Sequence, residues 1–243
     1  MKNRIKEQVL GELIDICYPD TRFHYDLSMF IPDFPGSTNA ASFLDEIDAY
    51  KSAQYVFVTP DNSLINARKK MLMDNKKLIV STYGIQRGFY YLDPSSISTS
   101  QFDFASTLDG LEYFSDEISL SALLAKINIF DFILTGAIVV DEKGSRFGKG
   151  HGYFDIESGM FLDVGLINQE SVMAAIVHDC QVCSDIIPCS VTDVAVDFIL
   201  TGTRLLKTFR TSHRVGIDWT KISADKLSHI SPLRDLKKGT ALG

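Results

Sequence analysis

A strand–helix–strand pattern between residues 54 and 81 constrains the fold more than any other feature of this sequence. Two short apolar runs, Gln54–Val58 and Lys77–Ser81, flank the segment Ser63–Asn75, which has helical periodicity. Two consecutive strands that are joined by a helix pair in parallel, and the crossover between them is right-handed. The pattern therefore predicts the beginning of a parallel sheet.

The rest of the chain continues this alternation of helices and strands. Amphipathic helices are predicted at residues 2–16 and 39–51, and a surface loop rich in Ser, Asp and Thr at residues 94–106. Further strands are predicted at residues 132–134, 137–140, 173–177, 194–200 and 215–217. Alternating strands and helices indicate an α/β protein with a mostly parallel central sheet.

Length and composition exclude several classes of protein. A chain of 243 residues that is 45% hydrophobic can bury a sizeable core, and we expect a single domain over residues 1–243. No apolar stretch approaches the roughly 20 residues that a membrane span requires. The first 15 residues interleave charge with aliphatics, so we expect no secretory signal and a cytoplasmic protein. The net charge of −7 argues against a surface built for nucleic acid.

Positive charge is concentrated in a C-terminal extension that begins at about residue 203. This segment, Thr203–Gly243, carries nine Lys and Arg against three Asp and Glu, whereas the rest of the chain carries 15 against 28. One interpretation is a basic tail that lies on an acidic body. The other is a tail that contributes cations to an anion-binding site.

Four cysteines, Cys17, Cys180, Cys183 and Cys189, are expected to be reduced thiols. Cys180 and Cys183 form a Cys-x-x-Cys pair, with His178 nearby, which is a fragment of some zinc and redox sites. No second such pair completes a tetrahedral set. We therefore favour thiols that fill space over a metal or redox centre.

The segment most informative about chemistry is the glycine-rich stretch Gly144–Asp155. Gly148, Gly150 and Gly152 alternate with Lys149 and His151, and a helix is predicted to begin near Asp155. Glycines allow the backbone to approach a ligand closely, and successive N–H groups that lead into a helix N-terminus form a cradle for phosphate oxygens. The alternative is a tight turn that binds no ligand, because short glycine motifs often occur in proteins that do not bind phosphate.

Side chains near these glycines fit the same chemistry. Arg146, Lys149 and His151 place positive charge on the loop, and Asp155 is a hard oxygen ligand suited to the Mg²⁺ that accompanies a nucleotide. Lys2 and Lys6 are four residues apart on the first predicted helix, so their amines project from one side of it.

The sequence resembles the 5-formyltetrahydrofolate cyclo-ligase family. Arg146–Asp155 is similar to the family signature RxGRGxGYYD, and Asp131–Gly136 is similar to its DLxxxPG strand. The family's Q…P…D…VD pattern is similar to Gln181, Pro188, Asp193 and Asp197. Lys2 and Lys6 fall where the family has an N-terminal Lys and, four residues on, an Arg. Other segments are similar to the subgroup of methenyltetrahydrofolate synthetase domain-containing proteins: Ile31–Gly36, Val177–Val182, Asp197–Thr201 and Trp219–Ile222.

This resemblance implies a three-layer α/β/α fold and an ATP- and Mg²⁺-dependent cyclisation. In the family's reaction ATP phosphorylates the formyl oxygen of 5-formyltetrahydrofolate, N10 closes onto the activated carbon, and loss of phosphate gives 5,10-methenyltetrahydrofolate. By resemblance, Lys2, Lys6 and Lys149 hold phosphates, Asp155 and Asp193 hold Mg²⁺, and Tyr153 lies against the formyl group.

Three positions differ from the family's pattern. Lys149 stands in place of an arginine, which keeps the charge but loses the bidentate fork. His151 stands where cyclo-ligases often have a lysine. The family's pterin-binding glutamate has no counterpart in Val58–Ser63, where Asp61 is the only candidate carboxylate. Asp61 could bind the substrate or could merely cap the following helix.

Three functional hypotheses follow for a protein whose partner is expected to be a small molecule. The first is a cyclo-ligase acting on 5-formyltetrahydrofolate or a close relative of it. The second is an ATP-dependent ligase or kinase that acts on a different small heterocycle. The third is a non-catalytic binding protein of the same fold.

Overall fold

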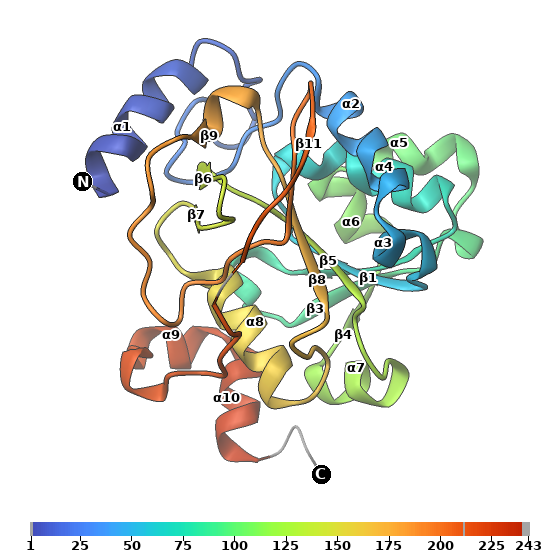
Figure 1. Ribbon diagram of the computed structural model, residues 1–243. Helices are drawn as coiled ribbons and strands as arrows, with labels where there is room; N and C mark the ends of the chain where they lie inside the picture. The colour runs from blue at the N-terminus through green and yellow to red at the C-terminus, as the bar shows by residue number, and fades with distance from the viewer. Residues whose placement is uncertain (1, 211, 240–243) are drawn as a thin grey trace.

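The computed structural model describes residues 2–210 and 212–239, apart from the side chains of Lys2 and Asn3. A central eight-stranded sheet has helices on both faces (Figure 1). The strand order is β11-β10-β8-β5-β1-β2-β3-β4. The five neighbouring strands β10, β8, β5, β1 and β2 are parallel, and β11, β3 and β4 add antiparallel pairings at the two edges. The predicted α/β class and mostly parallel sheet are confirmed.

The elements of the main sheet have the following bounds. Its strands are β1 (Tyr55–Val58), β2 (Lys77–Ser81), β3 (Phe89–Leu92), β4 (Asp116–Ile118), β5 (Phe132–Gly136), β8 (Val172–Ile176), β10 (Phe198–Leu200) and β11 (Leu205–Lys207). The helices are α1 (Lys2–Leu13), α2 (Ser37–Ser42), α3 (Asp48–Ser52), α4 (Ile65–Met73), α5 (Phe102–Ala105), α6 (Leu108–Phe114), α7 (Leu120–Lys126), α8 (Tyr153–Asp163), α9 (Ala224–His229) and α10 (Ser231–Lys238). A second, three-stranded sheet has the order β7-β6-β9, with β6 (Val139–Asp141), β7 (Arg146–Phe147) and β9 (Val182–Cys183).

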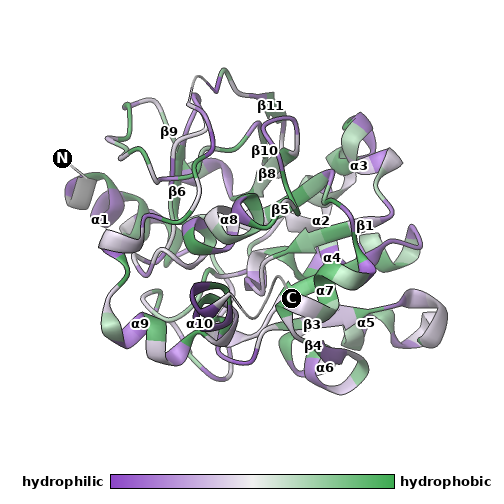
Figure 2. Cartoon of the chain, turned by 90° about the horizontal axis from the view of Figure 1, so that it is seen from below, coloured by the Kyte–Doolittle hydropathy of each residue, from purple (hydrophilic) through white to green (hydrophobic). Residues whose placement is uncertain are grey.

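Two large apolar clusters lie on the two faces of the main sheet, and two smaller ones include residues of α1. Val56 and Val58 point into the cluster shared with α2 and α4, whereas Phe57 between them points into the cluster shared with α7 and α8. Successive strand residues face opposite sides, so a strand that is apolar throughout must be covered on both. Figure 2 shows these central strands as the most hydrophobic part of the trace. The helices on the two faces give the three layers.

The predicted crossover at residues 54–81 is present as β1, α4 and β2, with β1 and β2 in parallel register from Tyr55–Lys77 to Val58–Val80. The helix is shorter than predicted, because a 3₁₀ turn at Asn62–Leu64 precedes α4. The first helix also ends early, at Leu13. The helix predicted at residues 39–51 is broken at Ile47, whose backbone is extended.

Two predictions in other segments are wrong. Residues 94–106 are not a loop, because 3₁₀ turns and α5 occupy them and the buried side chains of Phe102 and Ala105 anchor the last turn. The strand predicted at residues 215–217 is absent, since Gly216 packs against Asp163 and the backbone N–H of Ile217 donates to that carboxylate. The outermost strand of this edge is β11 instead. Of the strand predicted at residues 194–200, only Phe198–Leu200 is regular.

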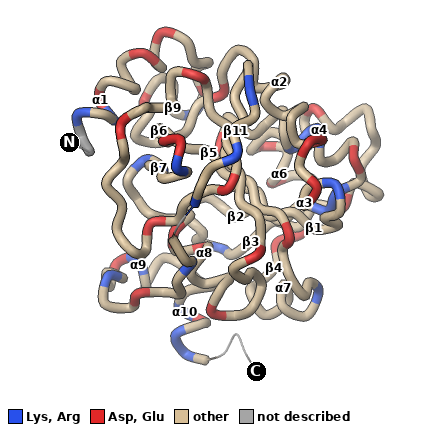
Figure 3. Tube along the Cα trace, viewed as in Figure 1, with Lys and Arg blue, Asp and Glu red and all other residues tan. Residues whose placement is uncertain are grey.

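The C-terminal extension packs along the body of the protein. Arg210 and Arg214 both donate to the carboxylate of Asp197, at 2.8 Å each, and Arg214 is buried. Figure 3 shows basic and acidic residues interspersed along the whole trace rather than gathered into one stripe. In the described part of the chain, no helix is both long enough and apolar enough to cross a membrane.

Candidate active site

A cavity of about 450 Å³ opens where β1, β2 and β5 end. Because these three strands are parallel, their carboxyl ends lie at one edge of the sheet, which is where α/β proteins bind ligands. The strand ends supply Thr59, Asp61, Ser81, Thr135 and Gly136 to the wall. Its size lies within the usual range of about 300–1,000 Å³ for small-molecule sites.

The opposite wall of the cavity is the glycine-rich loop between β7 and α8. Of the predicted stretch Gly144–Asp155, all residues from Arg146 onward line the cavity, whereas Gly144 and Ser145 do not. Gly150 and Gly152 have φ angles of +112° and +68°, which side chains with a Cβ rarely adopt. Gly152 immediately precedes α8, so the positive end of an 11-residue helix points at the cavity. A loop of this kind can cradle phosphate oxygens.

Arg146 lies beneath the loop with an unsatisfied donor. Its side chain is 4% exposed, its guanidinium lies 4.2 Å from the ring centre of Phe154, and its Nη2 donates to Asp155 Oδ1 at 3.1 Å. The Nε atom is buried and has no partner among the described residues. An anion in the cavity would supply an acceptor for this group.

Lysines from both ends of the chain hold the same loop. Lys6 of α1 donates to the backbone carbonyl of Lys149 at 2.9 Å, and Lys226 of α9 donates to that of His151 at 2.6 Å. Lys6 also lines the cavity. Lys2 begins α1, but its side chain lies outside the described residues. The C-terminal extension thus lies on the body and also reaches the glycine loop.

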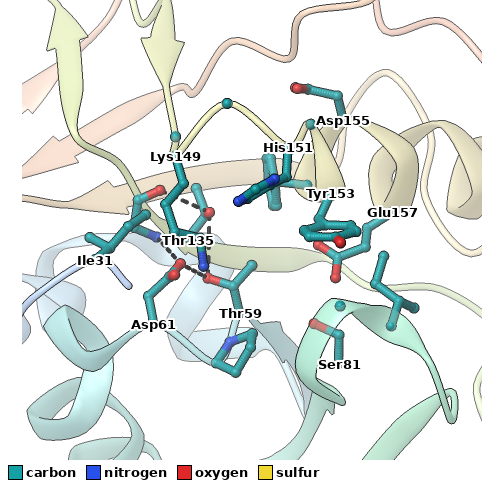
Figure 4. Close-up of a pocket in the computed structure, with 18 of the residues that line it drawn as sticks. Ile31, Thr59, Asp61, Ser81, Thr135, Lys149, His151, Tyr153, Asp155 and Glu157 are labelled. Atoms are coloured by element: carbon teal, nitrogen blue, oxygen red, sulfur yellow. Dashed lines mark hydrogen bonds between the residues drawn. The ribbon is translucent and has the colours of Figure 1, made fainter. Parts of the chain in front are cut away.

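Lys149, His151 and Tyr153 extend from the loop toward the strand ends (Figure 4). The amine of Lys149 lies 5.9 Å from the ring centre of Tyr83, and the rings of His151 and Tyr153 lie 5.6 Å apart at a tilt of 34°. These three side chains therefore lie between the glycine-rich loop and the ends of the strands.

The two predicted Mg²⁺ ligands, Asp155 and Asp193, both line the cavity. Asp155 Oδ1 accepts hydrogen bonds from Arg146 and from the backbone N–H of Val194, at 3.1 and 3.0 Å, which brings the segment of Asp193 next to α8. Asp193 itself accepts from the hydroxyl and the backbone N–H of Ser190. Across residues 2–210 and 212–239, no group of three or more His, Cys, Asp or Glu is arranged to hold a metal. Mg²⁺ bound with a nucleotide needs only one or two carboxylates, because phosphates and water complete its shell.

Asp61 makes internal hydrogen bonds at the cavity wall. Its Oδ2 accepts from Thr59 Oγ1 at 2.6 Å and from the backbone N–H of Gly136 at 3.2 Å, so it ties the end of β1 to the end of β5. Although Asp61 immediately precedes the 3₁₀ turn at Asn62, its side chain makes no capping hydrogen bond. Its carbonyl accepts from the fully buried Arg68. Asp61 therefore links the ends of β1 and β5, and it does not cap the following turn.

Glu157 is a carboxyl group of the site that the sequence did not single out. It lies one turn after Tyr153 on α8, lines the cavity and is 2% exposed. Burial raises the pKa of Glu157 to about 8, although a hydrogen bond from Ser81 opposes this change. Its Oε2 is buried and has no partner in the described part of the chain. The signal available in the sequence was the four-residue spacing from Tyr153, which places both side chains on one face of the helix.

The cysteines lie outside this cavity and are free thiols. Burial raises the pKa of Cys180 to about 11, which disfavours the thiolate that a metal or redox site requires. Cys180 and Cys183 are partly buried, and each packs against a small apolar cluster.

Comparisons with known proteins agree on one family. The model of the 5-formyltetrahydrofolate cyclo-ligase family matches residues 19–202. The methenyltetrahydrofolate synthase domain-containing protein of Homo sapiens is 32% identical over 242 residues, covering 97% of this chain and 61% of the human protein. Its counterpart from Danio rerio is 30% identical over 213 residues, covering 85% of this chain and 54% of that protein. The chain thus spans about half to three fifths of the length of these relatives.

A solved structure shares the fold. The 5,10-methenyltetrahydrofolate synthetase of Aquifex aeolicus superposes with a TM-score of 0.51 at 16% sequence identity, covering 91% of this chain and 99% of that one. At this identity the similarity establishes the architecture.

Proposed function

Because the chain belongs to the 5-formyltetrahydrofolate cyclo-ligase family, we propose that it catalyses the ATP- and Mg²⁺-dependent cyclisation of 5-formyltetrahydrofolate, or of a close relative of it. One observation supports this proposal above the others. The cation-flanked glycine loop and the polar ends of β1, β2 and β5 form opposite walls of a single cavity. A nucleotide and a second small molecule could therefore meet inside it.

The loop side fits the phosphates of ATP. The backbone of Gly148, Gly150 and Gly152 leads into the N-terminus of α8, and Arg146 Nε is a buried donor that needs an acceptor. Lys149 and Lys6 add positive charge, with His151 and Lys2 as further candidates. Asp155 and Asp193 would hold Mg²⁺, which neutralises charge on the transferring phosphoryl group.

The residues between the two walls would align the reacting groups. In the proposed reaction the γ-phosphoryl group passes to the formyl oxygen, N10 attacks the formyl carbon, and phosphate leaves with that oxygen. Lys149 extends across the cavity and would stabilise the charge that develops during transfer. Tyr153 would lie beside the formyl group. Little covalent chemistry is asked of the protein, so positioning and charge stabilisation carry catalysis.

A second candidate is an ATP-dependent ligase or kinase that acts on another small heterocycle. The observation in its favour is that Asp61 Oδ2 is already engaged by Thr59 and Gly136. This leaves the carboxylate that was expected to read the pterin with less hydrogen-bonding capacity. A non-catalytic binding protein of the same fold is the third possibility.

The decisive assay follows the absorbance of methenyltetrahydrofolate in a mixture of 5-formyltetrahydrofolate, ATP, Mg²⁺ and the protein. We expect slow turnover that requires both ATP and Mg²⁺. Clear stabilisation by ATP with Mg²⁺, but no absorbance change at any protein concentration, would support the second candidate. Absence of nucleotide binding would leave the third.

A further inference from the structure

We propose that Glu157 is the residue that reads the heterocycle, with its Oε2 accepting hydrogen bonds from amino or ring N–H groups of the bound molecule. This inference rests on the proposed function and goes beyond it, because it assigns the substrate-recognising carboxyl to α8 rather than to the loop after β1.

Two unsatisfied polar atoms define what the cavity lacks. Among the residues that the structure describes, seven buried side-chain nitrogen or oxygen atoms have no partner. Only two of them, Arg146 Nε and Glu157 Oε2, belong to residues that line this cavity. Buried polar groups in folded proteins are rarely left unpaired, so both atoms call for a partner that the chain itself does not supply.

The chemistry of these two atoms specifies the ligand. Arg146 Nε is a donor on a permanent cation and fits an anionic group, whereas Glu157 Oε2 in the ionised carboxylate is an acceptor and fits an N–H donor. Arg146 belongs to β7, at the start of the glycine loop, and Glu157 faces Ser81 at the end of β2. An anion bound on the loop side and a heterocycle with several N–H groups would satisfy both.

The orientation of Glu157 is fixed by its neighbours. Figure 4 shows its carboxyl group beside the ring of Tyr153 and directed toward Ser81, whose hydroxyl donates to it. Ser81 is 2% exposed and lies on β2, so the carboxyl is held between a helix and the sheet. A flat ring that lies along Tyr153 would present its edge to the free oxygen.

Asp61 differs from Glu157 in this respect. Its Oδ2 accepts two hydrogen bonds from within the protein. Recruiting that oxygen for a ligand would weaken the link between β1 and β5, whereas recruiting Glu157 Oε2 costs no existing hydrogen bond.

The test is ligand affinity by isothermal titration calorimetry for the wild type, Glu157→Gln, Asp61→Asn and Asp20→Asn. Asp20 is a buried carboxylate that lies outside the cavity lining, so its variant is a matched control for the change from acid to amide. The ligands are ATP with Mg²⁺, 5-formyltetrahydrofolate, and a panel of aminopyrimidines and aminopurines without a folate tail. We expect Glu157→Gln to weaken folate binding at least tenfold, Asp61→Asn to weaken it less, and neither Glu157→Gln nor Asp20→Asn to change ATP binding more than twofold.

The outcomes separate this inference from the proposed function. Equal folate affinity in the wild type and Glu157→Gln would overturn the inference and leave the function standing. If another panel member binds the wild type while 5-formyltetrahydrofolate does not, and this binding is lost in Glu157→Gln, the inference is supported and the folate is rejected as the substrate. If no heterocycle binds the wild type, both fall. Should Glu157→Gln fail to fold, Glu157→Asp withdraws the oxygen by one methylene, and unchanged heterocycle affinity in that variant would likewise overturn the inference.

Discussion

Arg146 and Asp155 form a salt bridge at 3.1 Å between the strand that precedes the glycine loop and the helix that follows it. The arginine side chain is 4% exposed and the aspartate 29%, so the pair closes the base of the loop largely away from solvent. The same Asp155 oxygen accepts from Val194, which links the loop to the segment that carries Asp193. The carboxylate of Asp155 therefore holds Arg146 at the start of the loop and also holds the backbone next to Asp193, the second predicted Mg²⁺ ligand.

Asp155→Asn should affect both stability and nucleotide binding. Removing one partner leaves the arginine charge buried, which costs up to about 3–5 kcal/mol when both groups are fully buried. Because Asp155 is partly exposed, we expect about 1–3 kcal/mol less free energy of unfolding, measured in urea. Stabilisation by ATP with Mg²⁺ should be lost in the same variant. Unchanged unfolding together with unchanged ATP binding would contradict both roles.

Lys149→Ala should remove nucleotide binding without unfolding the protein. A ligand at about 100 times its Kd stabilises a fold by roughly 2.7 kcal/mol, which a thermal-shift assay with ATP and Mg²⁺ detects easily. Lys149 is a half-buried loop residue, so its loss should change the melting temperature of the free protein little. Lys143→Ala, at an exposed turn outside the cavity, is the control and should bind ATP normally. Retention of the ATP shift in Lys149→Ala would place the phosphates elsewhere.

Gly136→Ala tests how closely the end of β5 must approach the β1 loop. A Cβ at this position would lie 2.8 Å from Ser63 Oγ and 3.0 Å from Asp61 Oδ2, closer than atoms pack without a shift. We expect a loss of about 1–3 kcal/mol in the free energy of unfolding, as in other overpacked sites. Gly165→Ala is a poor comparison because its φ is positive, whereas Gly11→Ala meets no atom within 4 Å and should be neutral or stabilising. Equal unfolding curves for Gly136→Ala and the wild type would show that this approach is loose.

Asp20 should make stability depend on pH in the acid range. Burial alone would raise its pKa, but hydrogen bonds from Arg22 and Asn62 outweigh burial and lower the pKa to about 2. A carboxylate whose pKa is lower in the folded state stabilises it above the ordinary value of 3.8, and this contribution declines as the pH falls toward 2. We expect Asp20→Asn to cost about 1–2 kcal/mol at pH 7 and clearly less at pH 3, measured by urea unfolding. A cost that stays constant between the two pH values would exclude this linkage.

The sequence predicted the elements whose pattern is local. The apolar runs at β1 and β2 were placed correctly, because a strand buried on both faces is apolar throughout, and the helix between them was placed to within two residues at each end. The glycine-rich stretch was also recognised from the sequence, because its residues are contiguous. Its residues 146–155 line the cavity.

Features that depend on contacts between residues far apart in the chain could not be predicted from local sequence patterns. Asp61 meets Gly136 across 75 positions, so its role as a bridge was invisible, and a capping role was considered instead. Glu157 was not singled out from the sequence, because only the fold buries it and brings it beside Ser81 at the end of β2. Similarly, residues 94–106 have the composition of a loop. They nevertheless include α5, because Phe102 and Ala105 are buried in the apolar cluster on that face of the sheet.

The two lysines that hold the glycine loop set an order on the assembly of the site during synthesis. Lys6 has already been made when Lys149 appears 143 positions later, so this contact can form as soon as the loop is free of the ribosome. Lys226 follows His151 by 75 positions, which takes roughly 4–15 s at about 5–20 residues per second. For those seconds the loop of the nascent chain can be held by Lys6 but not yet by Lys226.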